Sequence, residues 1–411
     1  MDEKLFRRDT YLRKIRPFYD ADDIIKVITG VRRCGKSSLM ETISEELIEA
    51  GVSKDNIIYI DLDKRGYKWI KKSADLEKVI EDKGTESGLK YLFIDEIQNV
   101  SGFEEVINGF RTDGGWSIFI TGSNSYLLSG ELVTKLTGRY LEFEMFPLTF
   151  DEYESMKQFY GKYIDPNSLV ELNQYILEGG FPRTIFLENM TDKRRYVHGV
   201  ILEIFEKDIR MRVKIRKKET FEIVRRYIIN YFGATTSLNK ICARLEASGN
   251  KISKDTVSRY IKALIDAKIL YECDRFDMKS GKMLSGEKKY YLSDLSFYYA
   301  DNTDNQINSG PALENIVYTY ARAHDHTVSV GRIGRLECDF ITRNQEMDYA
   351  YVQVAHTIAA SKDTEDREYR PLEKITDNYP RYVVTTDYIL QKRDGIRHVN
   401  MMDFMKEQRS F

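Results

Sequence analysis

One short segment, residues 30–38, constrains the fold of this chain more than any other. It reads Gly-Val-Arg-Arg-Cys-Gly-Lys-Ser-Ser and matches the pattern G-x-x-x-x-G-K-[ST] at every fixed position. A short β-branched run over residues 23–29 precedes it, and residues 38–50 follow it with helical spacing of their apolar side chains. The strand, loop and helix that this pattern requires are all predicted, which favours a phosphate-binding loop over a chance glycine turn.

The residue types in this loop suit a nucleoside triphosphate. Gly30 and Gly35 let backbone N–H groups wrap around the phosphates at a helix N-terminus, and Lys36 adds a positive charge at the β- and γ-phosphates. Ser37 offers a hydroxyl to Mg²⁺. We therefore expect ATP and Mg²⁺ as cofactors. The predicted nucleotide-binding residues are Gly30, Arg33, Cys34, Gly35, Lys36, Ser37 and Ser38.

A second apolar run, residues 90–98, ends in two adjacent carboxylates, Asp95 and Glu96. In an α/β sheet the ligand site lies beyond the carboxyl ends of the strands, which is where this run delivers both side chains. We expect Asp95 to hold Mg²⁺ through water or together with Ser37, and Glu96 to orient and deprotonate the attacking water. The alternative is a strand that simply ends in two solvated acids.

The following segments supply two further candidates. A predicted strand over residues 117–121 runs into Gly-Ser-Asn-Ser, and Asn124 is placed to reach the γ-phosphate or the attacking water. The alternative for Asn124 is an ordinary Asx turn. A helix over residues 126–136 leads to Arg139 and to a last strand over residues 141–146. Arg139 follows a glycine and is, on sequence alone, equally a surface arginine after a helix stop.

Composition bounds the class of protein. With 411 residues, 42% hydrophobic and 31% charged, the chain is predicted to be a cytoplasmic protein of two to four domains without a transmembrane helix. Its four cysteines are far apart and form no C-x-x-C pair, so we expect reduced thiols rather than a zinc site or disulfides.

The order of these parts resembles the AAA+ ATPases, specifically the bacterial and archaeal group with a winged helix and a C-terminal restriction-endonuclease-like domain. The resemblance is carried by the phosphate loop, Tyr-Leu-Phe-Ile-Asp-Glu-Ile-Gln, Ile-Thr-Gly-Ser-Asn-Ser, Leu-Thr-Gly-Arg-Tyr, Phe-Pro-Leu-Thr-Phe-Asp-Glu-Tyr and Gly-Gly-Phe-Pro. It implies that Asn124 is a sensor residue and that Arg139 is an arginine finger acting on a neighbouring subunit's nucleotide. It also implies a homo-oligomer, either a ring or a spiral, with a hexamer as one form.

The predicted fold class is α/β, with four regions. Residues 1–148 form a P-loop AAA+ core with a parallel sheet, and residues 149–215 form a helical lid. Residues 216–300 form a winged helix, and residues 301–411 form a small α/β restriction-endonuclease-like domain that is predicted to be inactive.

The winged-helix prediction lies in a basic part of a chain whose net charge is −2. Lys214 to Ser293 holds 18 Lys and Arg against 9 Asp and Glu. Two helices over residues 237–246 and 253–267 are followed by two strand-like pieces, which we interpret as a helix-turn-helix with a wing. We expect DNA as a partner, contacted through phosphates, although a solvated helix face or a protein-binding surface is the alternative. The predicted contacts are Lys254, Arg259, Lys262, Lys279 and Lys282.

In the last region, Glu314, Asp339 and Gln353 occupy three positions of a restriction-endonuclease-like site. The fourth position holds Ala355 where the pattern requires lysine. Because no neighbouring residue on the same strand face supplies a cation, we expect this site not to cut DNA.

Three functions are therefore considered. The first is a Mg²⁺-dependent, oligomeric ATPase that acts on DNA as a motor or switch. The second is a nucleotide-controlled signalling or scaffold ATPase that binds protein partners. The third is a nuclease gated by ATP.

Overall fold

A computed structural model of the chain describes residues 4–84, 86–122, 136, 138–301 and 309–411. The chain divides into two units, Met1–Met145 and Phe146–Phe411. The division falls close to the end of the predicted core at residue 148. The three regions predicted after residue 148 lie together in the second unit.

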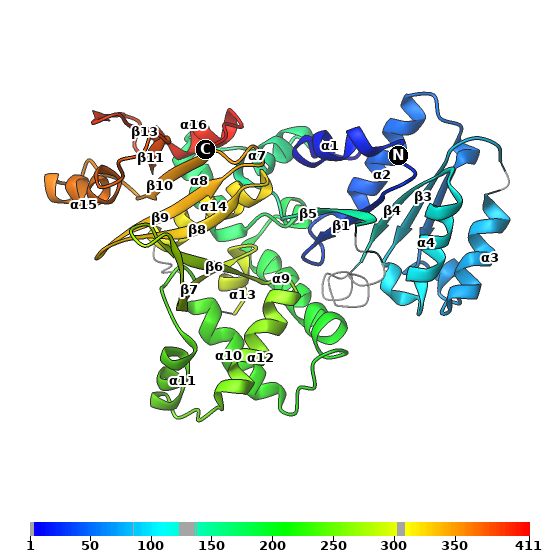
Figure 1. Cartoon of the computed structure of the whole chain (residues 1–411), viewed down its shortest axis with the longest axis horizontal. Helices are drawn as coiled ribbons and strands as arrows, with labels where there is room; N and C mark the ends of the chain where they lie inside the picture. The colour runs from blue at the N-terminus through cyan, green and yellow to red at the C-terminus, as the bar shows by residue number, and fades with distance from the viewer. Residues whose placement is uncertain (1–3, 85, 123–135, 137, 302–308) are drawn as a thin grey trace. The chain divides into compact units, whose positions relative to one another are not determined.

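Unit 1 is built on a parallel five-stranded sheet with the strand order β2-β3-β4-β1-β5 (Figure 1). The strands are β1 (Ile25–Gly30), β2 (Ile57–Asp61), β3 (Lys90–Asp95), β4 (Trp116–Thr121) and β5 (Tyr140–Met145). The described helices of more than one turn are α1 (Asp9–Ile15), α2 (Lys36–Glu49), α3 (Ser73–Lys83) and α4 (Phe103–Asp113). The predicted parallel sheet of the core is confirmed, with small differences at the strand ends.

Helices cover both faces of this sheet, which is why its strands are near-continuous apolar runs. Every residue of β1 and β4 is buried. On one face Ile94 and Ile120 pack in a core with Leu76 of α3 and Ile107 of α4. The other face lies against α2, which contacts β1 and β4. A sheet buried in this way leaves its strand ends, rather than its faces, available for a ligand.

Unit 2 begins with helices and ends with a second sheet. Its helices are α7 (Phe150–Phe159), α8 (Ser168–Glu178), α9 (Met190–Ile204), α10 (Lys218–Asn230), α11 (Leu238–Ala247), α12 (Lys254–Asp266), α13 (Ser296–Asp301), α14 (Ser309–Ala323), α15 (Lys362–Glu373) and α16 (Met401–Lys406). Its strands are β6 (Leu270–Asp277), β7 (Lys282–Leu292), β8 (Thr327–Ile333), β9 (Leu336–Arg343), β10 (Tyr349–Val354), β11 (Arg381–Thr385), β12 (Lys392–Arg393) and β13 (Ile396–Asn400).

The local signals for α12 are confirmed. The Ser253 side chain caps the helix by accepting a hydrogen bond from the Thr256 N–H at 3.4 Å. Val257, Ile261 and Leu264 are buried on one face, as their helical spacing predicts.

The hairpin β6–β7 belongs to a larger sheet than the sequence indicates. Its two strands pair antiparallel, but β6 also pairs in parallel with β8, with Arg275 opposite Val330. The resulting eight-stranded sheet has the order β12-β13-β11-β10-β9-β8-β6-β7. The predicted wing is therefore one edge of a sheet that continues to β13, across the boundary predicted at residue 300.

The Gly-Gly-Phe-Pro motif has a structural role in unit 2. A Cβ atom at Gly180 would lie 2.2 Å from the carbonyl oxygen of Leu148, so the backbone approach at this position requires glycine. The Gly180 N–H donates to the buried carboxylate of Asp294 at 2.6 Å, and the Leu148 N–H donates to the Gly180 carbonyl at 2.7 Å. The motif thereby ties the start of α7 to the segment after β7.

Candidate nucleotide site

The phosphate loop connects β1 to α2 at the carboxyl end of the sheet. Gly30 has a φ of 141° and Gly35 a φ of 111°, values that L-side chains rarely adopt. A Cβ atom at Gly30 would also lie 2.2 Å from the Met145 carbonyl oxygen at the end of β5. Two glycines are thus needed for the backbone path of the loop, as the motif predicts.

Lys36 is buried at the first position of α2. Its ammonium group donates to the carbonyl oxygens of Gly30 at 3.0 Å and Val31 at 3.3 Å, so its charge is held beside the loop backbone. Ser37 and Ser38, which follow it, are exposed. The loop therefore presents hydroxyl groups at the N-terminus of a 14-residue helix, with a cation next to them.

Cys34 and Arg8 are two buried residues that pack at the phosphate loop. Cys34 is fully buried, and burial raises the pKa of its thiol. The Arg8 guanidinium donates to the Cys34 carbonyl at 3.0 Å and is itself buried. Sequence reasoning missed Arg8 because nothing in the motif points to a residue so far upstream.

The two adjacent carboxylates lie at the same edge of the sheet as the loop. Asp95 ends β3, and the parallel pairing of β3 with β4 and of β4 with β1 brings the carboxyl ends of all three strands together. The Thr121 hydroxyl, at the end of β4, donates to Asp95 Oδ1 and accepts from the Glu96 N–H at 3.2 Å. Thr121 was not predicted, since its role depends on a neighbouring strand.

Glu96 occupies a strained backbone conformation with a φ of 56°, which turns its side chain away from the line of β3. Its carboxylate lies 3.7 Å from the Arg32 guanidinium and accepts a hydrogen bond from the Gln98 side chain. Burial raises the pKa of Glu96 above its ordinary value, and the charges of Arg32 and Lys36 oppose this shift. A raised pKa suits a carboxylate that accepts a proton near neutral pH.

The donor types at this edge fit Mg²⁺. The Ser37 hydroxyl and the Asp95 carboxylate are hard oxygen donors, which Mg²⁺ combines with phosphate oxygens and water. Over the ranges that the structure describes, no three His, Cys, Asp or Glu side chains are grouped to hold a metal ion. A Mg²⁺ ion at this edge would therefore depend on oxygens of the nucleotide.

The two remaining candidate site residues of the predicted ATPase core are Asn124 and Arg139. Asn124 lies outside the described residues. Arg139 is exposed at the start of β5, where its carbonyl accepts from the Ile25 N–H at 3.0 Å and its guanidinium donates to Asn108 Oδ1 at 3.3 Å. In the parallel register Ile25 faces Tyr140 and Gly30 faces Met145. Arg139 therefore lies at the opposite ends of the strands from the loop, roughly 20 Å away along the strands.

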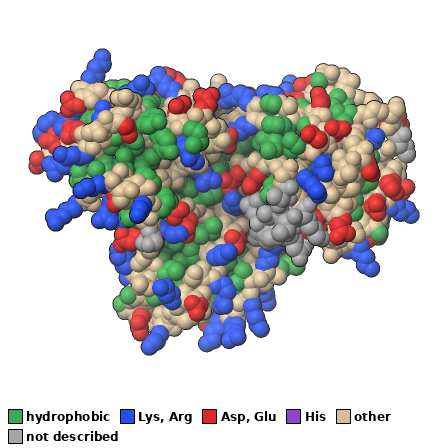
Figure 2. Space-filling view, viewed as in Figure 1, with side chains coloured by type: hydrophobic (Ala, Val, Ile, Leu, Met, Phe, Trp, Pro, Cys, Tyr) green, Lys and Arg blue, Asp and Glu red, His purple; other side chains and the backbone are tan. Residues whose placement is uncertain are grey.

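The predicted DNA contacts divide into separate groups. Figure 2 shows Lys and Arg side chains at the lower end of the molecule, where Figure 1 places α10 to α12. Lys254 and Lys262 line a cavity of about 530 Å³ that also contains Asp266 and Glu272. Arg259 lines a different cavity. The remaining two residues, Lys279 and Lys282, are exposed at the hairpin turn.

The predicted nuclease-like site contains a cation that we did not expect. Lys289 of β7 lies between carboxylates, with its ammonium 3.0 Å from Glu314 Oε2 and 2.9 Å from Glu337 Oε1. Lys289 lies on β7 and not on the strand that leads to Ala355, so it does not occupy the lysine position of the predicted pattern. Sequence reasoning missed it because β7 joins the C-terminal sheet instead of forming a separate wing. Burial and the nearby Glu314 raise the pKa of Asp339, which accepts from the Val354 N–H at 2.8 Å.

The other residues of that region do not complete a catalytic set. Gln353 donates to Glu368 Oε2 at 3.0 Å, and Ala355 is buried in the core of the sheet. Lys362, the first lysine after Ala355 in the sequence, pairs with Glu365 and Asp366. In this cluster Lys289 forms ion pairs with Glu314 and Glu337, and Arg275 forms a second ion pair with Glu337.

We predict that Lys289→Met will destabilise unit 2 by about 3–5 kcal/mol, because it leaves Glu314 without its buried cation, whereas Glu337 keeps its ion pair with Arg275. The matched control is Lys288→Met on the same strand, which removes a half-exposed pair with Glu272 and costs about 1 kcal/mol or less. Urea denaturation followed by circular dichroism measures both. Equal losses would contradict the structural role of Lys289.

In the described part of the chain, no helix has the length and apolar character needed to cross a membrane. A family model described as an AAA domain matches residues 22–154, and one described as a domain of unknown function (DUF8612) matches residues 169–306.

Two uncharacterized proteins are similar to this chain over most of its length. One, from Haemophilus influenzae, is 32% identical over 410 residues, which cover 98% of this chain and 100% of that protein. The other, from Methanocaldococcus jannaschii, is 28% identical over 389 residues, which cover 92% of this chain and 85% of that protein.

Solved structures with a similar fold include a Walker-type ATPase of Pyrococcus abyssi. It has a TM-score of 0.48 and 16% identity, and the match covers 72% of this chain and 95% of that chain. The ORC1 protein of Aeropyrum pernix, solved in complex with DNA, has a TM-score of 0.34 and 15% identity, with 72% and 92% covered.

Proposed function

This chain carries an AAA domain and belongs to the same family as the Haemophilus influenzae protein, and we propose that it hydrolyses ATP with Mg²⁺ to control its binding to DNA. The observation that carries the ATPase part is the arrangement at one sheet edge. There the loop with its buried Lys36 lies at the end of β1, and Asp95 and Glu96 lie at the end of β3.

The proposed roles follow from this arrangement. The loop residues Gly30 to Ser38 bind the phosphates, with Lys36 at the β- and γ-phosphates. Mg²⁺, held by Ser37 and Asp95, would neutralise charge on the phosphates. Glu96 orients the attacking water and accepts its proton, a role that its buried position and raised pKa favour. Asn124 is proposed to contact the γ-phosphate or the water.

We further propose that the protein assembles into a homo-oligomer, as a ring or a spiral, in which Arg139 completes the site of a neighbouring subunit. Arg139 lies at the edge of the sheet opposite its own loop, and an arginine in this position can stabilise a transferring phosphate only in another subunit. Its exposure at the start of β5 supports this role.

DNA is proposed as the partner because the segment from Lys214 to Ser293 has twice as many Lys and Arg as Asp and Glu. The proposed contacts are the α12 residues Lys254, Arg259 and Lys262 and the hairpin residues Lys279 and Lys282. A second candidate is an ATPase that binds a protein through this segment. Its distinguishing result would be nucleotide hydrolysis that DNA leaves unchanged. Ala355, at the position where a nuclease site requires lysine, is buried in the core and supplies no cation, which argues against a nuclease.

We predict that Glu96→Gln will bind ATP as wild type does but hydrolyse it on the order of 100-fold more slowly, because an amide cannot accept the proton of the attacking water. Steady-state phosphate release and equilibrium nucleotide binding are the measurements. Glu77→Gln, at an exposed position of α3, is the control for removing one carboxylate from unit 1. Wild-type turnover in Glu96→Gln would exclude this role.

A mixing experiment tests Arg139. Arg139→Ala and Lys36→Ala are each expected to be inactive, and mixing them should restore part of the activity. A mixed assembly contains interfaces with an intact loop on one subunit and an intact arginine on the next. Mixing Lys36→Ala with Glu96→Gln is the control and should restore no activity. Each of these substitutions disables the site of the subunit that carries it, so no intact site forms in the mixture. Assembly without recovery in the first mixture would contradict the proposal.

A further inference from the structure

The second cavity beside α12 is lined by basic side chains without an acidic one. It has a volume of about 620 Å³. Its charged lining residues, which we call the basic pocket, are Lys214, Arg216, Lys217, Lys251 and Arg259. All five are exposed, and they come from two segments that are distant in sequence, residues 214–217 and 251–259. Only Arg259 was among the predicted DNA contacts, so most of this pocket was not expected.

Two helices begin at the basic pocket. Helix α12 starts at Lys254 after its cap Ser253, which lines the cavity, and α10 starts at Lys218 after Lys217. No side chain caps the N-terminus of α10, where a lysine occupies the capping position. Both helices have 13 residues, so each adds a partial positive charge from its free N–H groups to the side-chain charges.

Few carboxylates neutralise these charges. Lys251 lies 3.5 Å from Glu246. Within the described ranges, Lys214, Arg216, Lys217 and Arg259 have no Asp or Glu oxygen within 4 Å. Such a concentration of like charge costs folding free energy, and an anionic partner would offset that cost.

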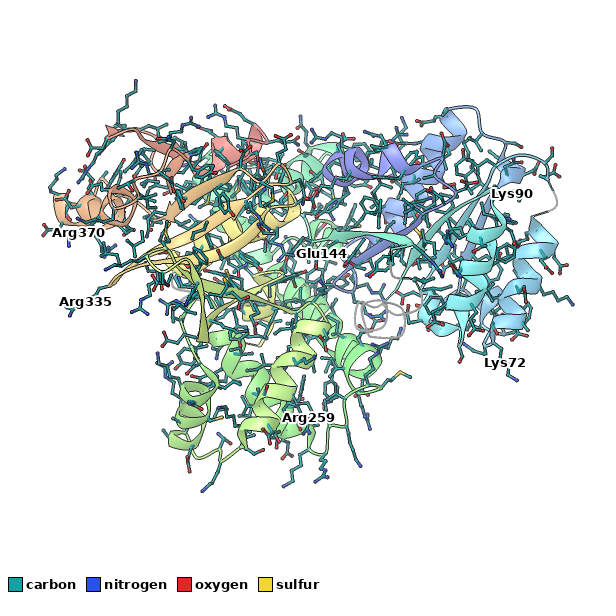
Figure 3. The ribbon with its side chains drawn as sticks, in the orientation of Figure 1. Lys72, Lys90, Glu144, Arg259, Arg335 and Arg370 are labelled. Carbon is teal, nitrogen blue, oxygen red and sulfur yellow. The ribbon has the colours of Figure 1, made fainter. Side chains whose placement is uncertain are left out.

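The cavity on the other side of α12 offers a direct comparison. There Lys254, Lys262 and Lys288 share the lining with Asp266 and Glu272, and Lys288 forms an ion pair with Glu272. That cavity is therefore of mixed charge, whereas no acidic side chain lines the cavity that contains Arg259, the residue labelled on α12 in Figure 3. An anion gains more electrostatic free energy on the basic side.

The form of the pocket indicates an extended polyanion rather than a small ion. Its cations are exposed and spread over two segments, instead of being buried and converging on one point. Apolar side chains, namely Ile223, Ile252 and Tyr260, complete the lining and suit the sugar part of a nucleic-acid backbone. We propose that the basic pocket binds the phosphodiester backbone of DNA and is the main electrostatic contact of this chain with DNA. This inference rests on the proposed DNA-binding function.

The test measures binding of the full-length chain to a fluorescent DNA duplex by anisotropy, over a series of salt concentrations. The pocket variant combines Arg216→Gln, Lys217→Gln and Arg259→Gln. We expect the slope of log K against log salt to flatten by up to roughly 3, and affinity near 0.1 M salt to fall on the order of 100-fold. All three side chains are exposed, so the fold should persist, and the thermal melt of the variant checks this.

Two further variants remove the same charge elsewhere. Lys54→Gln, Lys71→Gln and Lys78→Gln, at exposed positions of unit 1, should leave slope and affinity unchanged. Lys254→Gln, Lys262→Gln and Lys279→Gln should cause a smaller loss than the pocket variant. If the variant of Lys254, Lys262 and Lys279 loses more affinity than the pocket variant, the proposed role of the basic pocket is overturned, while the DNA-binding proposal is retained. If the wild-type chain does not bind the duplex, both are overturned.

Discussion

The parallel pairing of β1, β3 and β4 is the constraint on which the nucleotide site depends. Parallel strands bring their carboxyl ends to one edge, so residues separated by about sixty positions in sequence meet there. The pairing places the phosphate loop beside Asp95 and Glu96, and it places Thr121 where its hydroxyl can bond both. The parallel pairing of β5 with β1 places Arg139 at the opposite ends of the strands, away from its own loop. The parallel arrangement of the strands thus places Asp95 and Glu96, which are proposed to act within a subunit, far from Arg139, which is proposed to act on a neighbouring subunit.

Unit 2 contains charged side chains in two different environments, one buried and one exposed. Within the sheet, Lys289 is buried and balanced by Glu314 and Glu337. This cluster joins β7 to α14 and β9, and so holds the hairpin to the C-terminal strands. Around α10 and α12, basic side chains are left exposed beside helix N-termini with few acids near them. Balanced buried charges stabilise a fold, whereas concentrated exposed charges of one sign are typical of surfaces that bind an anion.

Local patterns in the sequence predicted a large part of the structure, and the parts they missed depend on distant partners. The strands β1, β3 and β4 could be predicted because each is a short apolar run, and α12 could be predicted because Ser253 caps it and its apolar residues recur at helical spacing. Arg8, Thr121 and Lys289 could not be predicted, since each acts through a residue far away in the chain. The parallel pairing of β6 with β8 is also non-local, and it extends the hairpin into an eight-stranded sheet.

The central claim is that the loop around Lys36 binds the phosphates of ATP. Equilibrium binding of a fluorescent ATP analogue with Mg²⁺, compared between wild type and Lys36→Met, tests it most directly, because methionine keeps the apolar length of the side chain and removes only the charge. A charge-assisted hydrogen bond to phosphate contributes about 1.5–3 kcal/mol, so the account predicts an affinity lower by roughly 10- to 150-fold. Equal affinity in the two proteins would contradict it.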